Sequence, residues 1–483
     1  MEPAEWGELV AVLAGEWPAG GVSSLAATPP APSIDRVSTD TREIAKGDIF
    51  FALAGERFDG HDFVECALAS GASACVVSRR HAARLAALAA VEGGRRLVAV
   101  EDPLAALERL AHRNRRESKV EVTAITGSVG KTTTKEFLRV VLSRRFATRA
   151  APKSFNNRIG VARTLLSADR STEHLVVEMG TSGPGELAHL SRSVRPERVI
   201  ITTVAPAHLS GLRDIDGVIA AKAEILEGLS PLGVAYVGAG VPGYEHFVER
   251  APGGVRSFGL ERGDVAAHGI RPTAVADVGW DFEVGSESYT VLVPGRHNVV
   301  NALAAVAVAL DLGLDPHEIR AGLAECRLPP RRLDVRVEGD VLFVDDSYNA
   351  NPRSMESALD AFDELAARRP DGRRIAVLGD MLELGDESRG FHERIGQRLA
   401  ARPVDCLVTV GGDSRYLSAS FVSDLASRGL GDTARVAHFE SALQAEAHLA
   451  SELRGGDTIL FKASNLLGMG RLAESLRATR RGD

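Results

Sequence analysis

The chain has 483 residues, of which 45% are hydrophobic and 25% charged, and its formal net charge is -8 with a pI of about 6.0. This length exceeds what one hydrophobic core usually organises, so two to four domains are expected. The composition excludes a disordered or fibrous chain, and the acidic balance disfavours nucleic acid as a partner.

The cysteines and the N-terminus indicate in which cellular compartment the protein is expected. Cys66, Cys75, Cys326 and Cys406 form no CxxC pair and no cluster at zinc spacing, so neither disulfides nor structural zinc are indicated. Residues 1–5 lack the basic start of a signal peptide, and no apolar run approaches the length of a membrane span. We therefore expect a soluble protein in a reducing cytoplasm, without membrane insertion.

From residue 120 onward, short β-branched runs alternate with longer helical patterns. The runs lie at 120–126, 175–178, 199–203, 342–345, 375–378, 407–410 and 458–461. This alternation is typical of buried parallel strands joined by helices, so the expected fold class is α/β throughout. Residues 81–90 predict a surface helix. Residues 258–293 alternate apolar and polar side chains without a helical period, which predicts antiparallel strands appended to the middle domain.

Two boundaries divide the chain into three expected domains. A strand-like run at 97–100 gives way to a helix start at Asp102-Pro103. The paired prolines in Leu328–Arg332 break the preceding helix and make a stiff connector. The expected domains are therefore residues 1–100, 101–328 and 329–483.

Residues 122–134 place a strand before a glycine turn and a helix, which predicts a loop that binds nucleotide phosphates. Lys131 would bring a positive charge to the β and γ oxygens, and the Thr132 hydroxyl can ligate magnesium. The first glycine of the general pattern would fall at Ile125, so this is a shorter T-G-S-x-G-K-T-T form. A glycine turn with an incidental lysine is the alternative. The expected contacts are Gly127, Ser128, Val129, Gly130, Lys131, Thr132 and Thr133.

This shorter loop resembles that of the Mur ligase family, and the resemblance extends along nearly the whole chain. It implies a central P-loop ATPase domain with a parallel sheet, a C-terminal Rossmann-like α/β domain and a smaller N-terminal α/β domain. Residues 38–42, 47–55 and 59–63 resemble the region with which these ligases hold a UDP-sugar substrate. The resemblance implies Thr41 and Arg42 as substrate contacts, and Thr41 keeps the hydroxyl of the more usual serine.

Three residues of the middle domain resemble the metal site of the family. They are Glu178 in 178–187, His208 in 207–209 and Lys222 in 221–225. The resemblance implies that Lys222 is carbamylated and that Thr132, Glu178, His208 and Lys222 hold two Mg²⁺ ions. Taken alone, His208 would cap a loop and Lys222 would be a solvated helix residue, but their order behind Glu178 favours the metal site.

Further segments resemble the nucleotide and sugar-peptide contacts of the family. Residues 294–305 resemble its adenine-contacting turn, with Asn298 as the base contact and a helix cap as the alternative. Arg332 resembles the arginine that reaches the γ-phosphate. Asn156 and Asn157 resemble a loop near the acceptor end of the sugar-peptide, with a plain polar turn as the alternative.

The C-terminal segments resemble the family member whose incoming substrate is D-alanyl-D-alanine. They are residues 344–355, which include paired aspartates, and residues 378–385. The resemblance implies that Asp346 contacts the nucleotide and that Tyr348 and Asn349 contact substrate. The alternative for residues 349–352 is a turn entering a helix.

Residues 461–470 resemble the Lys-Gly-Ser-Arg turn of the family but depart from it twice, with Ala463 for glycine and Asn465 for arginine. Lys462 and Ser464 keep the donor functions, so the resemblance implies that they bind the incoming dipeptide. A lysine that caps a strand end is the alternative. Asn465 lacks a fixed charge that could bind an anion.

The resemblance implies an ATP-dependent ligase, a monomer, that makes a peptidoglycan precursor. The carboxylate of UDP-N-acetylmuramoyl-tripeptide would attack ATP to give an acyl phosphate, and the amine of D-alanyl-D-alanine would then displace phosphate. Lys131, Arg332 and magnesium would neutralise charge. Lys222 would act through its carbamate, and His208 is a candidate base only if it does not bind metal.

Three alternatives remain at this point. A family member that adds the third peptide residue typically has Asp-Asn-Pro-Arg after a C-terminal strand, whereas residues 411–415 here read Gly-Gly-Asp-Ser-Arg. A folylpolyglutamate synthase is disfavoured by the first domain, which resembles a sugar-nucleotide site. A nucleotide-regulated binding protein is disfavoured because Lys131, Glu178 and Lys222 are all present.

Overall fold

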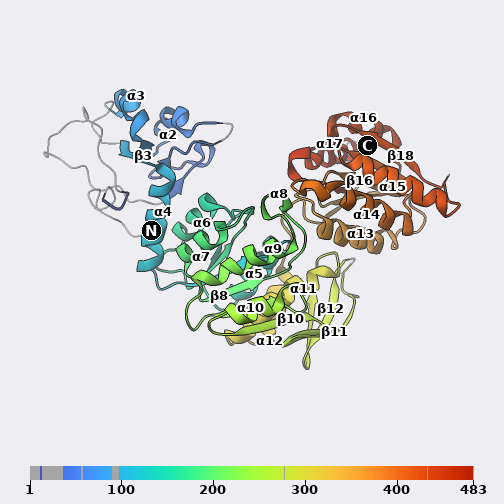
Figure 1. Cartoon of the computed structure of the whole chain (residues 1–483), viewed down its shortest axis with the longest axis horizontal. Helices are drawn as coiled ribbons and strands as arrows, with labels where there is room; N and C mark the ends of the chain where they lie inside the picture. Colours follow the sequence, from blue (N-terminus) through green and yellow to red (C-terminus); the bar gives the residue numbers. More distant parts are fainter. Residues whose placement is uncertain are drawn as a thin grey trace. The chain divides into compact units, whose positions relative to one another are not determined.

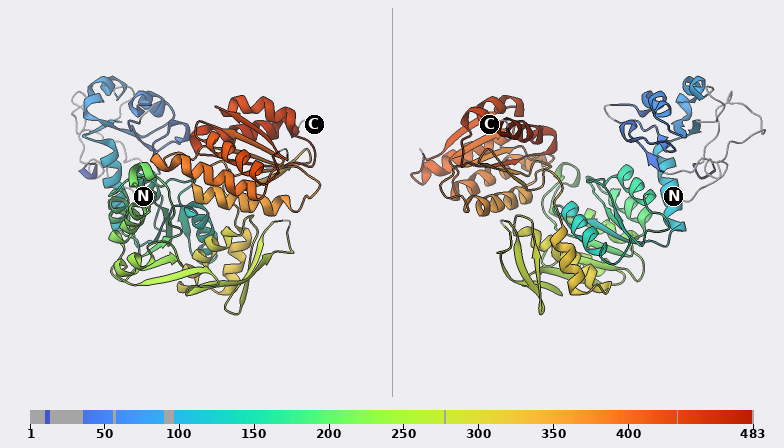
Figure 2. Two further views of the ribbon diagram at one scale, coloured as in Figure 1. Left: turned by 45° about the vertical axis from the view of Figure 1, so that its right-hand side comes forward. Right: turned by 180° about the vertical axis from the view of Figure 1, so that it is seen from behind.

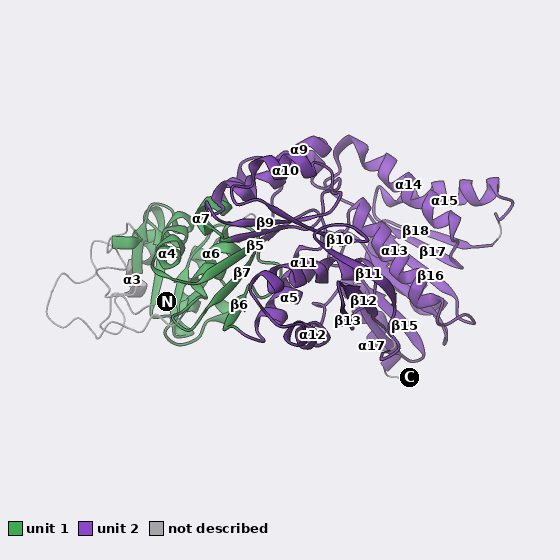
Figure 3. Ribbon diagram, turned by 90° about the horizontal axis from the view of Figure 1, so that it is seen from below, with its two compact units in different colours: residues 1–124, 146–179, 190–197 green, residues 125–145, 180–189, 198–483 purple. Residues whose placement is uncertain are grey.

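The structure is a computed structural model that describes residues 11–13, 36–55, 58–89, 97–276, 278–431 and 433–481. The expectation for residues 1–5 lies outside these ranges. By internal contacts the chain divides into two compact units, one formed by residues 1–124, 146–179 and 190–197 and the other by residues 125–145, 180–189 and 198–483 (Figure 3). Among the described residues, no helix combines the length and apolar character needed to cross a bilayer.

The first unit contains a four-stranded parallel sheet in the order β1-β2-β3-β4. Its elements are β1 (Val37–Ser38), β2 (Ile49–Phe51), α2 (Val64–Ala69), β3 (Ala74–Ser78), α3 (Arg79–Ala89) and β4 (Leu97–Val100). A small core of Phe50, Val64, Val77 and Leu97 fills the space between sheet and helices. The predicted helix at 81–90 corresponds to α3, and the predicted strand at 97–100 is β4.

Helix α4 (Pro103–Glu117) begins where the sequence predicts. Asp102 accepts a hydrogen bond from the backbone N–H of Leu104 at 2.8 Å, and Pro103 occupies the first turn. Near its other end, the buried Arg115 donates to the carbonyl of Val194 at 2.7 Å and pairs with Glu197 at 2.6 Å. A buried guanidinium is tolerated only when it is paired in this way. Arg115 thus ties α4 to a segment some 80 residues later in the chain.

The middle of the chain forms a nine-stranded sheet in the order β13-β12-β11-β10-β9-β8-β5-β7-β6. Its strands are β5 (Glu121–Thr126), β6 (Thr148–Ala150), β7 (His174–Glu178), β8 (Arg198–Ile201), β9 (Val234–Gly238), β10 (Val255–Leu260), β11 (Val265–Pro272), β12 (Trp280–Val284) and β13 (Glu287–Val291). Its helices are α5 (Lys131–Leu142), α6 (Arg158–Leu166), α7 (Glu186–Val194), α8 (Leu209–Leu212), α9 (Ile215–Ala223), α10 (Tyr244–Arg250), α11 (His297–Asp311) and α12 (Pro316–Glu325).

The prediction of antiparallel strands across residues 258–293 is wrong in part. β11, β12 and β13 do pair antiparallel, but β10 pairs parallel with both β9 and β11. The β9–β10 pair is parallel because α10 lies between the two strands and forms their crossover. Figure 2 shows the antiparallel strands beside α11 and α12, which cover them.

The C-terminal sheet has the order β14-β15-β19-β16-β17-β18, in which only the β14–β15 pair is antiparallel. Its strands are β14 (Asp334–Glu338), β15 (Val341–Asp345), β16 (Arg374–Gly379), β17 (Cys406–Val410), β18 (Arg435–Phe439) and β19 (Thr458–Lys462). Its helices are α13 (Pro352–Ala366), α14 (Ser388–Ala401), α15 (Ser414–Ser427), α16 (Ala442–Glu452) and α17 (Met469–Arg481).

Helices cover both faces of this sheet. Figure 1 shows α16 and α17 on one side and α13, α14 and α15 on the other. On the α16 and α17 side, Phe343, Phe461 and Leu472 belong to one buried core. Strands buried on both faces are why residues 342–345, 375–378, 407–410 and 458–461 read as continuous apolar runs.

Two glycines of α14 offer a test of how closely α14 and α15 pack. A Cβ at Gly396 would collide with the carbonyl oxygen of Leu417 and lie 3.0 Å from the backbone nitrogen of Phe421, whereas one at Gly390 would meet only the flexible end of Arg394, at 3.5 Å. We expect Gly396→Ala to destabilise the chain by roughly 1 to 3 kcal/mol, because backbone cannot move aside easily.

Gly390→Ala is the matched control in the same helix. It should leave stability unchanged or raise it by up to about 1 kcal/mol, because alanine is the better helix former. Calorimetric unfolding of the full chain measures both variants. Equal unfolding temperatures for the two would show that α14 and α15 do not meet at Gly396.

Candidate active site

The turn between β5 and α5 is shaped by two glycines with positive φ, Gly127 at 145° and Gly130 at 91°. A Cβ at Gly127 would collide with the Thr202 hydroxyl, and one at Gly130 would collide with the side-chain oxygen of Asn301. Glycine is therefore required at both positions by conformation and by space. The predicted order of strand, glycine turn and helix is present, and it aims the N-terminus of a 12-residue helix at the loop.

Hydrogen bonds with the segment that follows β8 fix this loop. The Ser128 backbone N–H donates to the carbonyl of Thr203 at 2.7 Å, and its hydroxyl donates to Ala205 at 2.8 Å. The Thr202 hydroxyl donates to the carbonyl of Val129 at 2.6 Å. The Lys131 ammonium lies over the loop and donates to the carbonyl of Gly127 at 2.6 Å. These hydrogen bonds fix the loop in one conformation, and the Lys131 side chain folds back onto it.

Arg332 reaches this loop from the connector. Its guanidinium donates to the hydroxyl of the buried Thr132 at 2.9 Å and stacks on the ring of Tyr348, 4.1 Å from the centroid. The structure therefore brings together Arg332, Thr132 and Tyr348, which the sequence assigned to the γ-phosphate, the metal and the substrate. A cation beside the first turn of the helix suits a polyphosphate ligand.

Lys222 is buried near the end of α9, with 2% of its surface exposed. Burial, together with the positive charge of Lys131, lowers the pKa of Lys222 to about 7. The solvated-helix alternative for Lys222 is therefore wrong. A lysine with this pKa is substantially a neutral amine at neutral pH, which is the form that reacts with carbon dioxide.

His208 adopts a left-handed backbone with φ of 55° just before α8. Its Nδ1 pairs with the carboxylate of Glu383, a residue of the C-terminal part. Burial and the charges of Lys131 and Lys222 lower the pKa of His208, against the opposing effect of Glu383. Because Nδ1 is engaged, Nε2 is the nitrogen left to act as a ligand or a base. Sequence reasoning gave Glu383 no role.

In the first unit, Glu178 ends β7 and is 1% exposed. Its Oε1 accepts a hydrogen bond from the side-chain amide of Asn156 at 2.9 Å. Asn157 caps α6, because its side chain accepts from the backbone N–H of Gly160 at 2.9 Å. The sequence grouped the two asparagines, but the structure gives them different partners: one orients the predicted metal ligand and the other begins a helix.

Asn298 has a role that the sequence did not anticipate. Its side chain is buried, donates to the carbonyl of Pro294 at 2.7 Å and accepts from Asn301 at 2.8 Å. The helix-cap alternative is wrong, because α11 begins at His297 with Arg296 as its cap. Since Asn301 also lies against Gly130, the adenine-contact candidate is linked to the phosphate loop through a residue that sequence reasoning missed.

The loop after β15 is held by Lys462, which is 2% exposed at the end of β19. Its ammonium contacts the Asp346 carboxylate at 2.6 Å and the carbonyls of Asp346 and Asn349 at 3.2 and 2.9 Å. Three partners account for the three N–H groups of the lysine. In this conformation Lys462 organises the loop, as its strand-end alternative suggested.

Ser464 and Asp346 also accept hydrogen bonds from backbone N–H groups. The Ser464 hydroxyl accepts from the backbone N–H of Leu382 at 2.9 Å, and Asp346 accepts from the backbone N–H of Leu333 at 3.0 Å. Asn351 caps α13, so residues 349–352 do form a turn entering a helix. Its side-chain amide also lies 3.4 Å from the carbonyl of Ser128, a contact with the phosphate loop that the sequence did not predict.

The predicted sugar-nucleotide contacts lie in a short 3₁₀ turn, residues Thr41–Glu43. The exposed Arg42 pairs with Asp40 at 2.6 Å and holds the pKa of that carboxyl down at about 2. Nearby, His61 is buried: its Nδ1 faces Asp59 at 2.5 Å and its Nε2 accepts from the backbone N–H of Ser78 at 2.9 Å. Although Asp59, His61 and His81 lie within ligand distance of one another, both nitrogens of His61 are already engaged, so the cluster is a structural one.

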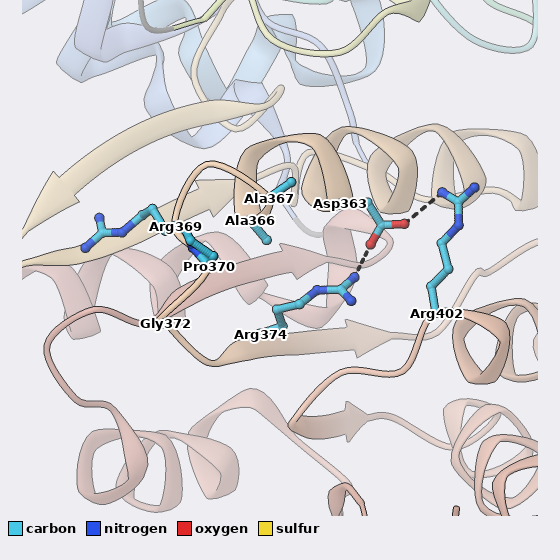
Figure 4. Close-up of a pocket in the computed structure, with 8 residues that line it drawn as sticks. All are labelled: Asp363, Ala366, Ala367, Arg369, Pro370, Gly372, Arg374 and Arg402. Atoms are coloured by element: carbon cyan, nitrogen blue, oxygen red, sulfur yellow. Dashed lines mark hydrogen bonds and ion pairs between the residues drawn. The ribbon is translucent and has the colours of Figure 1, made fainter.

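A pocket of about 490 Å³ lies elsewhere on the C-terminal part (Figure 4). It is lined by Asp363, Ala366, Ala367, Arg369, Pro370, Gly372, Arg374 and Arg402. Asp363 pairs with Arg374 and, at 3.0 Å, with Arg402. Arg374 begins β16, so the pocket lies at the amino ends of the parallel strands. Ligands of open α/β sheets bind at the opposite edge, so we do not assign this pocket to the site.

Comparison with known proteins gives matches along most of the chain. Three family models match the chain: "Mur ligase family, catalytic domain" at residues 33–115, "Mur ligase middle domain" at residues 125–309, and "Mur ligase, glutamate ligase domain" at residues 331–465. The chain is 32% identical to UDP-N-acetylmuramoyl-tripeptide–D-alanyl-D-alanine ligase of Bacillus subtilis, over 92% of this chain and 93% of that protein. It is 34% identical to the same enzyme of Escherichia coli, over 92% and 94%.

Solved structures of MurF enzymes are also similar to this chain. A crystal structure of MurF from Acinetobacter baumannii has a TM-score of 0.80 and 32% identity, covering 99% of each chain. MurF of Thermotoga maritima, solved in complex with ADP, has a TM-score of 0.74 and 28% identity, covering 93% of this chain and 98% of that one. The fold is therefore a three-domain one.

The contacts of Lys462 predict how the loop after β15 responds to substitution. Lys462→Met should destabilise the chain by roughly 3 kcal/mol, because it leaves the Asp346 carboxylate without its buried partner. Adding Asp346→Asn should recover much of that loss by removing the orphaned charge. Thermal unfolding of the single and double variants measures this. Strictly additive losses would contradict the assigned pair.

Proposed function

We infer that the chain, which belongs to the Mur ligase family, is an ATP-dependent ligase that joins D-alanyl-D-alanine to UDP-N-acetylmuramoyl-tripeptide. The observation that carries this inference is the similarity, at 32 to 35% identity over 92% of the chain, to enzymes named for this reaction. The product would be the pentapeptide precursor of peptidoglycan. The preorganised phosphate loop and the arginine that reaches it are the parts that such an activity requires.

The chain's own residues account for the neutralisation of charge during phosphoryl transfer. The carboxylate of the tripeptide substrate attacks the γ-phosphorus of ATP, the bond to the β-γ bridging oxygen breaks, and ADP leaves. Negative charge then spreads over the γ oxygens. Lys131 contacts the loop at Gly127, Arg332 contacts it at Thr132, and both would bind these oxygens. The amine of the dipeptide then forms the amide bond as phosphate leaves with its electron pair.

Magnesium fits the residues present. Thr132 and Glu178 offer the hydroxyl and carboxylate oxygens that Mg²⁺ prefers, and the amide of Asn156 holds the Glu178 carboxylate in one orientation. Carbamylation of Lys222 would add an anionic oxygen ligand, and His208 would offer Nε2. Two ions would supply positive charge to the phosphate oxygens. We propose Thr132, Glu178, His208 and carbamylated Lys222 as the residues that hold them.

The environment of Lys222 supports its carbamylation. The neutral amine forms a bond to the carbon of carbon dioxide and loses a proton, so that a neutral group becomes an anionic carbamate. The nearby positive charge of Lys131 disfavours a protonated Lys222 and favours the anionic carbamate. A neutral or carbamylated lysine also avoids the cost of burying a positive charge.

The remaining assignments also form part of the proposal. Thr41 and Arg42 would contact the sugar nucleotide, Asn298 the adenine, and Tyr348 and Asn349 the substrate in the C-terminal part. We further propose a monomer that acts in the cytoplasm, where ATP is available and where four free cysteines persist as thiols.

Phosphate release tests this proposal directly. With ATP and UDP-N-acetylmuramoyl-tripeptide carrying either diaminopimelate or lysine, the wild-type chain should release phosphate only when D-alanyl-D-alanine is added. Lys131→Ala should lower the rate at least about 100-fold, because it removes a cation from the transferred phosphoryl group. The exposed Lys119→Ala is the matched control. Equal rates with D-alanine alone would support a ligase that adds one amino acid, and release independent of both acceptors would contradict ligation.

The carbamate has its own test. Lys222→Ala should lower activity strongly, and a short carboxylate such as acetate should partly restore it by placing anionic oxygen in the vacated space. The same acetate should not restore Lys131→Ala, whose defect is the loss of a cation. Full activity of Lys222→Ala in carbonate-free buffer would rule out an essential carbamate.

A further inference from the structure

Arg331 occupies a backbone conformation that favours glycine. Its φ is 64°, in the left-handed region, and Leu333 has a φ of 50° two residues later. A residue with a Cβ is strained there, whereas glycine is not. Strained residues of this kind persist where the side chain has a function and where neighbouring contacts stabilise the conformation. The side chain of Arg331 is therefore the feature to explain.

The guanidinium of Arg331 is fixed by three hydrogen bonds. Nε donates to the Ser347 hydroxyl at 3.1 Å, and Nη2 donates to the Ser347 carbonyl at 2.6 Å and to the side-chain oxygen of Asn465 at 3.1 Å. Ser347 is itself held by the buried Asp345, whose Oδ1 accepts from its hydroxyl at 2.5 Å. A Cβ at Gly470 would collide with the guanidinium, so glycine there leaves the room that Arg331 needs.

Nη1 is the part of this group that remains available. Within the described ranges, every hydrogen bond of the Arg331 side chain uses Nε or Nη2, and the residue is half-buried rather than enclosed. With Nε and Nη2 engaged, the two N–H groups of Nη1 are the donors that an anion can use, and a carboxylate is an anion that a guanidinium binds well.

The contact with Asn465 places the Arg331 guanidinium at one edge of the C-terminal sheet. Asn465 stands in the turn after β19 where the family's Lys-Gly-Ser-Arg turn has arginine, so a positive charge is missing from that position. Arg331 places a guanidinium against the Asn465 side chain. The charge that is absent at 465 is thus supplied from 331. The two residues meet beyond the carboxyl ends of β15 and β19, which pair as parallel neighbours. This is the edge where open α/β sheets bind ligands.

We propose that Arg331 binds the carboxylate of the incoming dipeptide. The proposal rests on the proposed function, because D-alanyl-D-alanine carries an ammonium group that must reach the activated carbonyl and a carboxylate that must be bound elsewhere. Lys462 is committed to Asp346 and Asn349, and Arg332 is committed to Thr132. Arg331 is a neighbouring cation whose Nη1 donates to no residue in the described ranges. Leu466, which follows Asn465, has an exposed side chain that would be available to the methyl groups.

Arg331→Gly is the first test, because glycine fits the backbone and relieves its strain. The KM for D-alanyl-D-alanine should rise at least tenfold, since a charge-assisted contact is lost, while the KM for ATP should change less than twofold. Arg471→Ala removes the exposed arginine that directly follows Gly470 and serves as the control, with both KM values unchanged. Arg331→Gly with Asn465→Arg should return the KM for the dipeptide toward the wild-type value.

An acceptor without the carboxylate separates binding from a general structural effect. The wild-type chain should use D-alanyl-D-alaninamide at least tenfold less efficiently than D-alanyl-D-alanine, in kcat/KM, and Arg331→Gly should lose that discrimination. Retention of the full preference in Arg331→Gly would overturn the proposal. If the wild-type chain fails to use D-alanyl-D-alanine at all, the proposed function fails instead, so the two failures are distinguishable.

Discussion

The absence of side chains at Gly127 and Gly130 is the constraint on which the site depends. Thr202 and Asn301 approach the turn so closely that a single methyl group at either glycine would push them away. That approach aligns β8, which precedes Thr202, and α11, which carries Asn301, with the start of α5. Through Asn301 the turn is linked to Asn298, and through Thr132 it is linked to Arg332. The candidate phosphate loop, the candidate base contact and the connector arginine are therefore linked through this turn.

The four cationic side chains near this turn and at the end of β19 have different surroundings. Lys131 and Arg332 are directed at the phosphate loop, Lys462 is neutralised by Asp346, and Lys222 is kept from full protonation by burial. Consecutive arginines at 331 and 332 point to different partners because the backbone turns sharply between two left-handed residues. The connector thereby places one guanidinium at the loop before α5 and the next one at the edge of the C-terminal sheet.

The sequence predicted the elements with strong local patterns and missed those without them. The apolar runs at 175–178, 375–378 and 458–461 correspond to β7, β16 and β19 because these strands are buried on both faces. The short β6 and the half-exposed β14 were missed, since neither has a continuous apolar run. The domain boundaries near residues 100 and 328 stay predictions. Residue types at the phosphate loop could be recognised because all of its parts are adjacent in sequence.

The contacts that complete the site depend on residues far apart in the chain, which is why the sequence did not reveal them. His208 and Glu383 are separated by 175 positions, and Asn351 and Ser128 by 223. Asn465 could be recognised as a departure, yet its partner Arg331 lies 134 positions earlier and becomes visible only when both side chains are placed. This contact also couples the two positions. With arginine at both, two guanidinium groups would face each other and repel when no anion lies between them. Each position thus limits the side chains that the other can carry.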